Sequence, residues 1–327
     1  MYLLLLSIIA FFFLEIGYFK IADRYNIIDK PNQRSSHTQI TLRGGGVIFP
    51  IAFVLGIIVF EPHYYLLAIA VLAIATISFL DDVITLNNKL RISVHILSVL
   101  LLLSQIFINQ NISVASLNLV SYILLLGSII VIIGVINAYN FMDGINGITV
   151  LYSLVTLISC FYIQSYLALE LLEEEIFLLL IASLVVFAFF NLRKKAKCFA
   201  GDVGSIAVAL IISFFIGTLV WLTQDVKWIL LLGVYGLDAV ATIVCRMLRK
   251  ENIFDAHRSH FYQFLANDKK WSHVLIAFLY AGCQLLVNAA LILLPTLALY
   301  VVFSMLVIVY VVLRLILEGK KRLFSTY

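Results

Sequence analysis

Charged side chains are scarce in this chain of 327 residues: Asp, Glu, Lys and Arg make up 12%, whereas hydrophobic residues make up 63%. A soluble globular domain carries about 25% charged residues, so the composition excludes an ordinary soluble protein. The apolar residues form runs of about 17–22, long enough to cross a bilayer core as helices. The sequence therefore predicts an all-α polytopic membrane protein, with residues 1–327 as a single transmembrane domain.

Two further absences narrow the possibilities. The four cysteines are widely spaced without a C-x-x-C pair, which excludes a disulfide framework or a cysteine metal site. Residues 1–18 have no basic leading segment and no small-x-small cleavage site after them, so we expect a retained first helix rather than a signal peptide.

Eleven segments qualify as membrane spans by length and hydrophobicity. They are 2–19, 44–60, 64–80, 92–108, 120–136, 148–168, 175–191, 204–222, 228–245, 273–294 and 297–316. An odd number of spans divides the connectors into two sets, and 21 of the 22 Lys and Arg residues fall in one of them. The positive-inside rule predicts that this basic set is cytoplasmic.

The stretch from Asn137 to Ile148 is polar, although it separates two apolar runs. An amide or acid recurs at every third position: Asn137, Asn140, Asp143 and Asn146. On a helix this spacing keeps neighbouring side chains near one face. Two interpretations stay open, a polar connector between membrane helices or a polar wall that faces a bound ligand.

Other connectors of the basic set also carry candidate residues. Asp81 and Asp82 end the third span, and such adjacent carboxylates tolerate each other best beside a cation, here Lys89 or Arg91. A Gly-Asp-x-Gly-Ser turn containing Asp202 enters the eighth span, where backbone donors and a carboxylate together suit a metal-bound phosphate.

The first connector is a basic loop that contains Arg34 and ends in three glycines. These glycines open the second span, where free backbone N–H groups favour anions, so Gly45 is a candidate anion-binding residue. A flexible basic loop is the alternative interpretation.

Residues 246–272 form the largest connector of the basic set, and it contains the run from Asp255 to His260. Asp238 lies upstream, inside the ninth span, where a charge normally faces the bundle interior and is a functional candidate. The histidines of the loop are either part of the site or ordinary loop residues.

Five acids from the connectors on one side of the membrane suggest a shared chemistry. They are Asp81, Asp82, Asp143, Asp202 and Asp255. Carboxylates and amides bind Mg²⁺ through oxygen, and nearby cations stabilise phosphoryl charge. We therefore expect an active-site cleft at the cytoplasmic face of a membrane enzyme that joins a water-soluble polyanion to a lipid-borne partner.

Two other classes are the alternatives. A transporter or lipid flippase would place its acids near mid-membrane and show inverted repeats, and we find no such repeat. A non-catalytic scaffold would need neither Asp238 inside a span nor the Gly-Asp-Val-Gly-Ser turn.

The motifs resemble those of the polyprenyl-phosphate N-acetylhexosamine-1-phosphate transferases, the MraY/WecA superfamily of glycosyltransferase family 4. The resemblance covers essentially the whole chain. Its motifs are Asp-x-Pro-Asn-x-Arg-x-x-His at 29–37, Gly-Gly at 44–45, Asp-Asp at 81–82, Asn-x-x-Asn-x-x-Asp-Gly-x-x-Gly at 137–147, Phe-x-Gly-Asp-x-Gly-Ser at 199–205 and a histidine-bearing last loop.

The resemblance implies transfer of a sugar 1-phosphate from a UDP-N-acetylhexosamine to undecaprenyl phosphate, with release of UMP and a requirement for Mg²⁺, for which Mn²⁺ is a candidate substitute. It implies a multi-pass protein of the bacterial inner membrane with a cytoplasmic active site and no nucleic-acid partner, and it is compatible with a homodimer.

The resemblance also implies roles for individual residues. Metal binding falls to Asp202 and Asp82, and catalysis to Asp81, Asp82 and Asp143. The predicted substrate-binding residues are Arg34, Gly45, Lys89, Arg91, Asn137, Asn140, Asn146, His257, Arg258 and His260. Asp81 is the expected base for the lipid phosphate, and a covalent aspartyl route would use the same residues.

The chain departs from the family pattern at three places, one of which is Thr41-Leu42 where the family commonly has Thr-Pro. Asn146 stands where the family often has a second acid, which puts a metal or base role there in doubt because an amide carries no charge. The last loop reads His-Arg-Ser-His, which is closer to the branch that starts O-antigen or other surface glycans. Candidate donors are therefore UDP-GlcNAc, UDP-FucNAc and UDP-QuiNAc.

Overall fold

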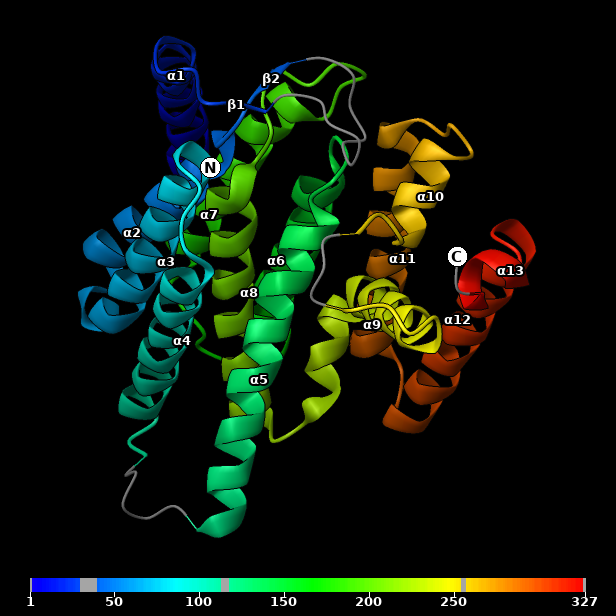
Figure 1. Ribbon diagram of the computed structural model, residues 1–327. Coiled ribbons are helices and arrows are strands. Elements are labelled where there is room, and N and C mark those ends of the chain that lie inside the picture. The colour runs from blue at the N-terminus through cyan, green and yellow to red at the C-terminus, as the bar shows by residue number, and fades with distance from the viewer. Residues whose placement is uncertain (1, 30–39, 113–117, 254–256, 326–327) are drawn as a thin grey trace.

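The computed structural model describes the chain except for residues 1, 30–39, 113–117, 254–256 and 326–327. Long helices run side by side through the molecule, and short elements lie between them (Figure 1). The elements are α1 (Tyr2–Arg24), β1 (Ile28–Asp29), β2 (Thr41–Leu42), η1 (Gly45–Val47), α2 (Ile48–Phe60), η2 (Pro62–Tyr64), α3 (Tyr65–Val83), α4 (Asn88–Asn109), α5 (Leu119–Met142), α6 (Ile148–Tyr166), α7 (Glu174–Asn191), α8 (Gly201–Thr223), η4 (Val226–Leu232), α9 (Gly233–Leu248), α10 (Phe261–Asn267), α11 (His273–Leu293), α12 (Thr296–Leu317) and α13 (Lys320–Phe324).

Helices account for nearly all of the regular structure. Ten helical segments in the described part of the chain are long and apolar enough to cross a membrane, and a shorter apolar helix covers Gly45–Phe60. Each of the predicted spans thus lies on a helix, the second on the short one. The described strands, β1 and β2, have two residues each and pair antiparallel. The prediction of an all-α polytopic membrane protein is confirmed.

Helix α8 lies at the centre of the bundle. Most of its residues are buried, including 89% of its most apolar 18-residue stretch, and it packs against α2, α3, α5 and α6. Gly46 and Gly204 let the start of α8 approach the η1 turn, since a Cβ on Gly46 would collide with the Gly204 Cα. The central helix therefore begins beside the loop that follows β2, and its first turn carries Asp202.

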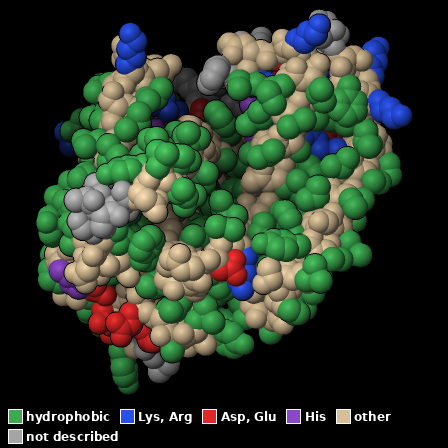
Figure 2. Space-filling view, turned by 90° about the horizontal axis from the view of Figure 1, so that it is seen from below, with side chains coloured by type: hydrophobic (Ala, Val, Ile, Leu, Met, Phe, Trp, Pro, Cys, Tyr) green, Lys and Arg blue, Asp and Glu red, His purple; other side chains and the backbone are tan. Residues whose placement is uncertain are grey.

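The connectors gather at two ends of the bundle. At one end the backbone N–H of Glu173 donates to Glu61 Oε1 at 2.9 Å, and Gln105 Nε2 donates to the His63 carbonyl at 3.1 Å. Seen from below, hydrophobic side chains are spread over the whole surface, and a patch of acidic side chains lies at its edge (Figure 2). The connectors after β2, α3 and α5 and before α8 meet at the opposite end, described below.

The ninth predicted span is broken. It begins as the 3-10 helix η4 and continues as α9 from Gly233. A change of helix type frees backbone groups, which must be paired inside the bundle. Gln284 of α11 pairs two of them: its Oε1 accepts from the Val234 N–H at 2.9 Å and its Nε2 donates to the Leu230 carbonyl at 2.8 Å. Tyr152 of α6 also donates to Gln284 Oε1, at 2.5 Å.

Candidate active site

Arg43 joins two acids that are far apart in the sequence. Its Nε lies 2.6 Å from Asp82 Oδ1, and one Nη lies 2.9 Å from Asp202 Oδ1. The Tyr18 hydroxyl of α1 donates to the Arg43 carbonyl at 2.5 Å and so fixes the backbone from which the guanidinium extends. Coulombic attraction from both acids raises the pKa of Arg43, although burial opposes this, and the residue stays charged at every physiological pH.

Asp82 is the most enclosed of these acids, with a side chain that is 0% exposed. Its Oδ1 accepts the backbone N–H of Asp202 at 3.0 Å, and its Oδ2 accepts that of Val203 at 3.1 Å. These are among the N–H groups that the first turn of a helix leaves without a helical partner, and a carboxylate there also meets the positive end of the helix dipole. Asp82 therefore anchors the start of α8 and fixes the position of Asp202.

Arg91 of α4 joins the same cluster from the other side. One of its Nη atoms lies 2.7 Å from Asp81 Oδ2, and the other lies 3.5 Å from Asp202 Oδ2. Asp81 Oδ1 also accepts the Leu86 N–H at 2.8 Å, which holds the turn between α3 and α4. The predicted neighbour Lys89 is exposed, and its backbone N–H donates to Asn87 Oδ1 at the helix cap.

Glycines make the close approach of these loops possible. Gly44 and Gly201 adopt φ values of 82° and 72°, a region that L-residues avoid. A Cβ on Gly201 would also collide with Asp82 Oδ2. The Gly45 and Gly46 N–H groups, which we expected to face an anion, donate to the Phe199 and Ala200 carbonyls at 2.9 and 3.0 Å. Gly45 thus braces the loop before α8 through its backbone.

The polar stretch at the end of α5 divides into two parts. Asp143 caps α5, and Asn140 Nδ2 lies 3.5 Å from Ser205 Oγ on α8, so both belong to the end of the bundle that carries Asp202. Asn137 is exposed on α5. Asn146 is buried, and its Nδ2 donates to the Arg193 carbonyl at 2.8 Å, so its amide ties two connectors together.

Burial raises the pKa of Asp143 to about 6, and the negative charge of Asp202 adds to this effect. A hydrogen bond with Thr149 and the positive charge of Arg43 act in the opposite direction. A carboxylate whose pKa lies this close to neutrality can both accept and release a proton.

Asp238 organises the last loop. Its Oδ1 accepts the Phe261 N–H at 3.0 Å and its Oδ2 accepts the Tyr280 hydroxyl at 2.6 Å, and the side chain is fully buried. His260 Nδ1 lies 3.4 Å from Asp238 Oδ1. Asp238 thus anchors the first turn of α10, and His260 is buried at that anchor.

His257 lies against the end of α5. Its ring centroid is 5.8 Å from that of Phe141 and 5.0 Å from that of His260, and its Nδ1 is 3.2 Å from Ser259 Oγ. The Tyr262 hydroxyl donates to the Phe141 carbonyl at 2.7 Å, which fastens α10 to the same helix end. Burial lowers the pKa of His257 to about 4, so its imidazole is neutral at pH 7.

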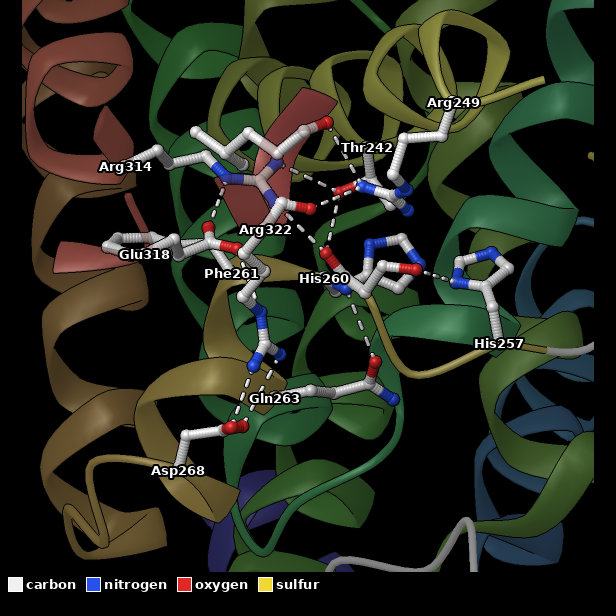
Figure 3. A network of polar contacts seen from close by, with 12 residues as sticks. Thr242, Arg249, His257, His260, Phe261, Gln263, Asp268, Arg314, Glu318 and Arg322 are labelled. Atoms are coloured by element: carbon white, nitrogen blue, oxygen red, sulfur yellow. Dashed lines mark hydrogen bonds and ion pairs between the residues drawn. The ribbon is translucent and has the colours of Figure 1, made fainter. Parts of the chain in front are cut away.

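A polar network connects this loop to the C-terminal helices (Figure 3). Arg314 of α12 donates to the Ser259 carbonyl at 3.0 Å and to Thr242 Oγ1 at 3.2 Å, and it pairs with Glu318 at 2.5 Å. A cavity of about 280 Å³ adjoins the network and is lined by Arg249, Glu251, Arg258, Ser259, Glu318 and Arg322. The predicted residue Arg258 therefore lines this cavity.

The structure brings together Asp81, Asp82, Asp202 and Arg91 from the predicted set, with Asn140 and Asp143 on the neighbouring helix end. Arg34 and Asp255 lie outside the described residues. Sequence reasoning did not include Arg43 among the site residues. The signal available for it was its place directly before the three glycines.

The acid cluster fits a metal that is shared with a substrate. Among the residues that the structure describes, no group of three or more His, Cys, Asp or Glu side chains could hold a metal ion by itself. Mg²⁺ is commonly bound by one or two carboxylates together with waters and substrate phosphates, and Asp202, 14% exposed, is open enough to be one of them.

The sequence is similar to those of known transferases. A family model described as glycosyl transferase family 4 matches residues 64–224. A probable undecaprenyl-phosphate N-acetylglucosaminyl 1-phosphate transferase of Bacillus subtilis (strain 168) is 27% identical over 75% of this chain and 71% of its own length.

Two further relatives come from other bacteria. A phospho-N-acetylmuramoyl-pentapeptide-transferase of Carboxydothermus hydrogenoformans is 31% identical over 61% of this chain and 68% of its own length. An undecaprenyl-phosphate alpha-N-acetylglucosaminyl 1-phosphate transferase of Thermotoga maritima is 27% identical over 83% of each chain.

Proposed function

The chain belongs to glycosyl transferase family 4, and we propose that its acids and arginines bring a UDP-sugar, Mg²⁺ and a lipid phosphate together at one membrane face. It is a phosphoglycosyltransferase that transfers N-acetylhexosamine 1-phosphate to undecaprenyl phosphate, a membrane step of surface-glycan synthesis. The donor is a UDP-N-acetylhexosamine and the released product is UMP. The face is cytoplasmic, because it carries the connectors that hold nearly all of the Lys and Arg residues.

One observation carries this proposal. Arg43 pairs with Asp82 at 2.6 Å and with Asp202 at 2.9 Å, and Arg91 adds Asp81 to the same cluster. Acids that must share a small volume with two phosphates need a metal and fixed cations beside them. Asp202 would hold Mg²⁺, or Mn²⁺ in its place, and the ion would neutralise the charge that develops on the departing UMP.

The arginines bind and orient the phosphates. Arg43 and Arg91 present planar guanidinium groups, which suit bidentate contacts with phosphate oxygens. Asp82 keeps the start of α8 in place, so the carboxylate of Asp202 stays aimed at the cluster. Asp81 keeps Arg91 in position through the ion pair of 2.7 Å.

Asp143 is the proton acceptor that we favour for the lipid phosphate. Asp81 and Asp82 both accept backbone N–H groups and pair with arginines, so both carboxylates are already engaged in holding the loops together. Asp143, with a pKa of about 6, can take up a proton near neutral pH. This assignment differs from the expectation of Asp81, and a covalent aspartyl route would use the same cluster.

The last loop provides the binding surface for the sugar and diphosphate. The neutral imidazole of His257 can donate one hydrogen bond and accept another, which suits sugar hydroxyl and amide groups. Arg258 supplies a positive charge for the diphosphate. His260 and Asp238 act indirectly, because they hold α10 in position.

A donor panel tests the proposal. Purified protein in detergent would receive undecaprenyl phosphate, Mg²⁺ and one radiolabelled donor at a time: UDP-GlcNAc, UDP-FucNAc or UDP-QuiNAc. We expect a labelled lipid from at least one donor, dependence on the metal, and reversal when UMP is added in excess. No labelled lipid from any UDP-N-acetylhexosamine, or full activity in excess chelator, would contradict the proposal.

A further inference from the structure

In this structure Arg43 occupies the place of a counter-cation between the acids. Its guanidinium contacts Asp82 at 2.6 Å and Asp202 at 2.9 Å, and its side chain is 32% exposed. Without a cation between them, two carboxylates this close to one guanidinium would repel each other in a partly buried site. Arg43 therefore stabilises the two carboxylates beside each other.

Asp82 and Asp202 differ in their other contacts, and this difference determines which of the two acids Arg43 can release. Asp82 is fully buried and keeps two backbone N–H groups besides Arg43. The Asp202 side chain is 14% exposed and its carboxylate faces two guanidinium groups, Arg43 at 2.9 Å and Arg91 at 3.5 Å. A divalent cation that binds Asp202 must compete with these two, and Arg43 is the closer competitor.

We infer that Arg43 is the residue that sets metal affinity at this site. Its guanidinium stays paired with Asp202 until a divalent cation binds the carboxylate and a diphosphate binds the guanidinium. A diphosphate supplies the anion that the released guanidinium needs, so binding of the metal and of the donor favour each other. This inference rests on the proposed function, because it takes Asp202 as the metal ligand.

Substrate-free binding of Mn²⁺ tests the inference without measuring activity. Free Mn²⁺ would be followed by electron paramagnetic resonance at pH 8 for the wild-type chain and for Arg43→Gln. Removal of the competing positive charge is expected to tighten Mn²⁺ binding by about tenfold. The melting temperature of Arg43→Gln without metal should fall below that of the wild type, and Mn²⁺ should recover it.

Two further variants complete the experiment. Arg193→Gln is the matched control, because Arg193 stacks on Phe189 and donates to its carbonyl, and the variant should bind Mn²⁺ like the wild type. Arg43→Lys keeps the charge but not the planar fork and should bind Mn²⁺ with an intermediate affinity, which provides a test if Arg43→Gln does not fold.

The possible outcomes distinguish a failure of this inference from a failure of the proposed function. Equal Mn²⁺ affinities for the wild type, Arg43→Lys and Arg43→Gln, with transfer still dependent on metal, would overturn the inference alone. A wild-type chain that binds no Mn²⁺ and transfers the sugar in excess chelator would overturn both.

Discussion

The carboxylate of Asp82 receives the backbone N–H of Asp202 at 3.0 Å, so one acid of the cluster positions another. The two residues come from α3 and α8, 120 positions apart in the sequence. Asp82 has its oxygens filled by backbone donors and Arg43, whereas Asp202 contacts only arginine side chains through its carboxylate in the described contacts. The two acids therefore have different roles.

Asp82→Asn should lower both stability and activity, because an amide in that place loses the charge and offers a donor where an acceptor is needed. The loss of a charge-assisted cap and of a buried ion pair should cost about 2–4 kcal/mol. Asp202→Asn should lose activity with a much smaller change in stability. Thermal unfolding in detergent without ligands measures this, and a larger loss for Asp202→Asn than for Asp82→Asn would contradict the assignment.

Asp143 gives a prediction for stability as a function of pH. Its pKa in the folded chain, about 6, lies above its ordinary value of 3.8, so the folded chain holds the proton more tightly than the unfolded chain. The free energy of unfolding contributed by this group is highest below about pH 4 and is lost as the pH rises through about 6. Asp143→Asn should thus be more stable than the wild type at pH 8, by roughly 1–2 kcal/mol after allowance for partial exposure, and equally stable at pH 4.

The same residue gives a prediction for activity. If Asp143 accepts the proton of the lipid phosphate, kcat/KM of the wild type should fall as the pH is lowered through about 6. In Asp143→Asn the rate should be low, and this decrease at low pH, the acid limb of the pH profile, should be missing. An unchanged acid limb in the variant would exclude Asp143 as the base and return the role to Asp81.

Asp238 should act through the position of the last loop. Asp238→Ala leaves the buried N–H groups of Phe261 and Tyr262 and the Tyr280 hydroxyl without their acceptor, and should cost about 3 kcal/mol or more. If the variant folds, KM for the donor should rise more than kcat falls, because binding by the loop is lost.

The matched control for this variant is Asp268→Asn. Asp268 is 43% exposed and pairs with Arg322 at 2.7 Å on the surface, so its loss should change stability by less than about 0.5 kcal/mol. Equal effects of the two variants on stability and on KM would contradict the anchoring role of Asp238.

Gln284 should be needed for the break in the ninth span. Gln284→Leu fits the space but leaves the Val234 N–H and the Leu230 carbonyl unpaired in the bundle, at a cost of about 1–3 kcal/mol for each buried group. Thermal unfolding and hydrogen exchange at residues 230–236 would measure the effect. Wild-type stability and protection in the variant would show that these backbone groups find other partners.

The sequence was informative where charge and hydrophobicity act locally. Long apolar runs predicted the spans. The position of Asp81, Asp82 and Asp202 at the ends of such runs made them candidate site residues. The three-residue spacing from Asn137 to Asn146 predicted one shared helix face, and this is correct only in part. Helix α5 ends at Met142, and Asn146 lies in the turn beyond it. A spacing argument for a helix face cannot extend past the end of the helix.

The remaining features depend on partners distant in the chain. Arg43 finds Asp202 159 positions away, and hydropathy contains no information about such pairing. The break at Gly233 depends in the same way on Gln284 from another helix. Asp238 is a related case: its depth in a span marked it as important, but only the fold shows that it anchors α10.

The account depends most on Asp202 as the metal-binding acid of a sugar-phosphate transfer. The most direct measurement is Mg²⁺-dependent formation of UMP from a UDP-N-acetylhexosamine and undecaprenyl phosphate by the wild type, Asp202→Asn and Asp225→Asn. Asp225 follows the opposite end of α8 and pairs with Lys227 there, which makes it the matched control. The account predicts that only Asp202→Asn loses UMP formation, and wild-type rates in Asp202→Asn would contradict it.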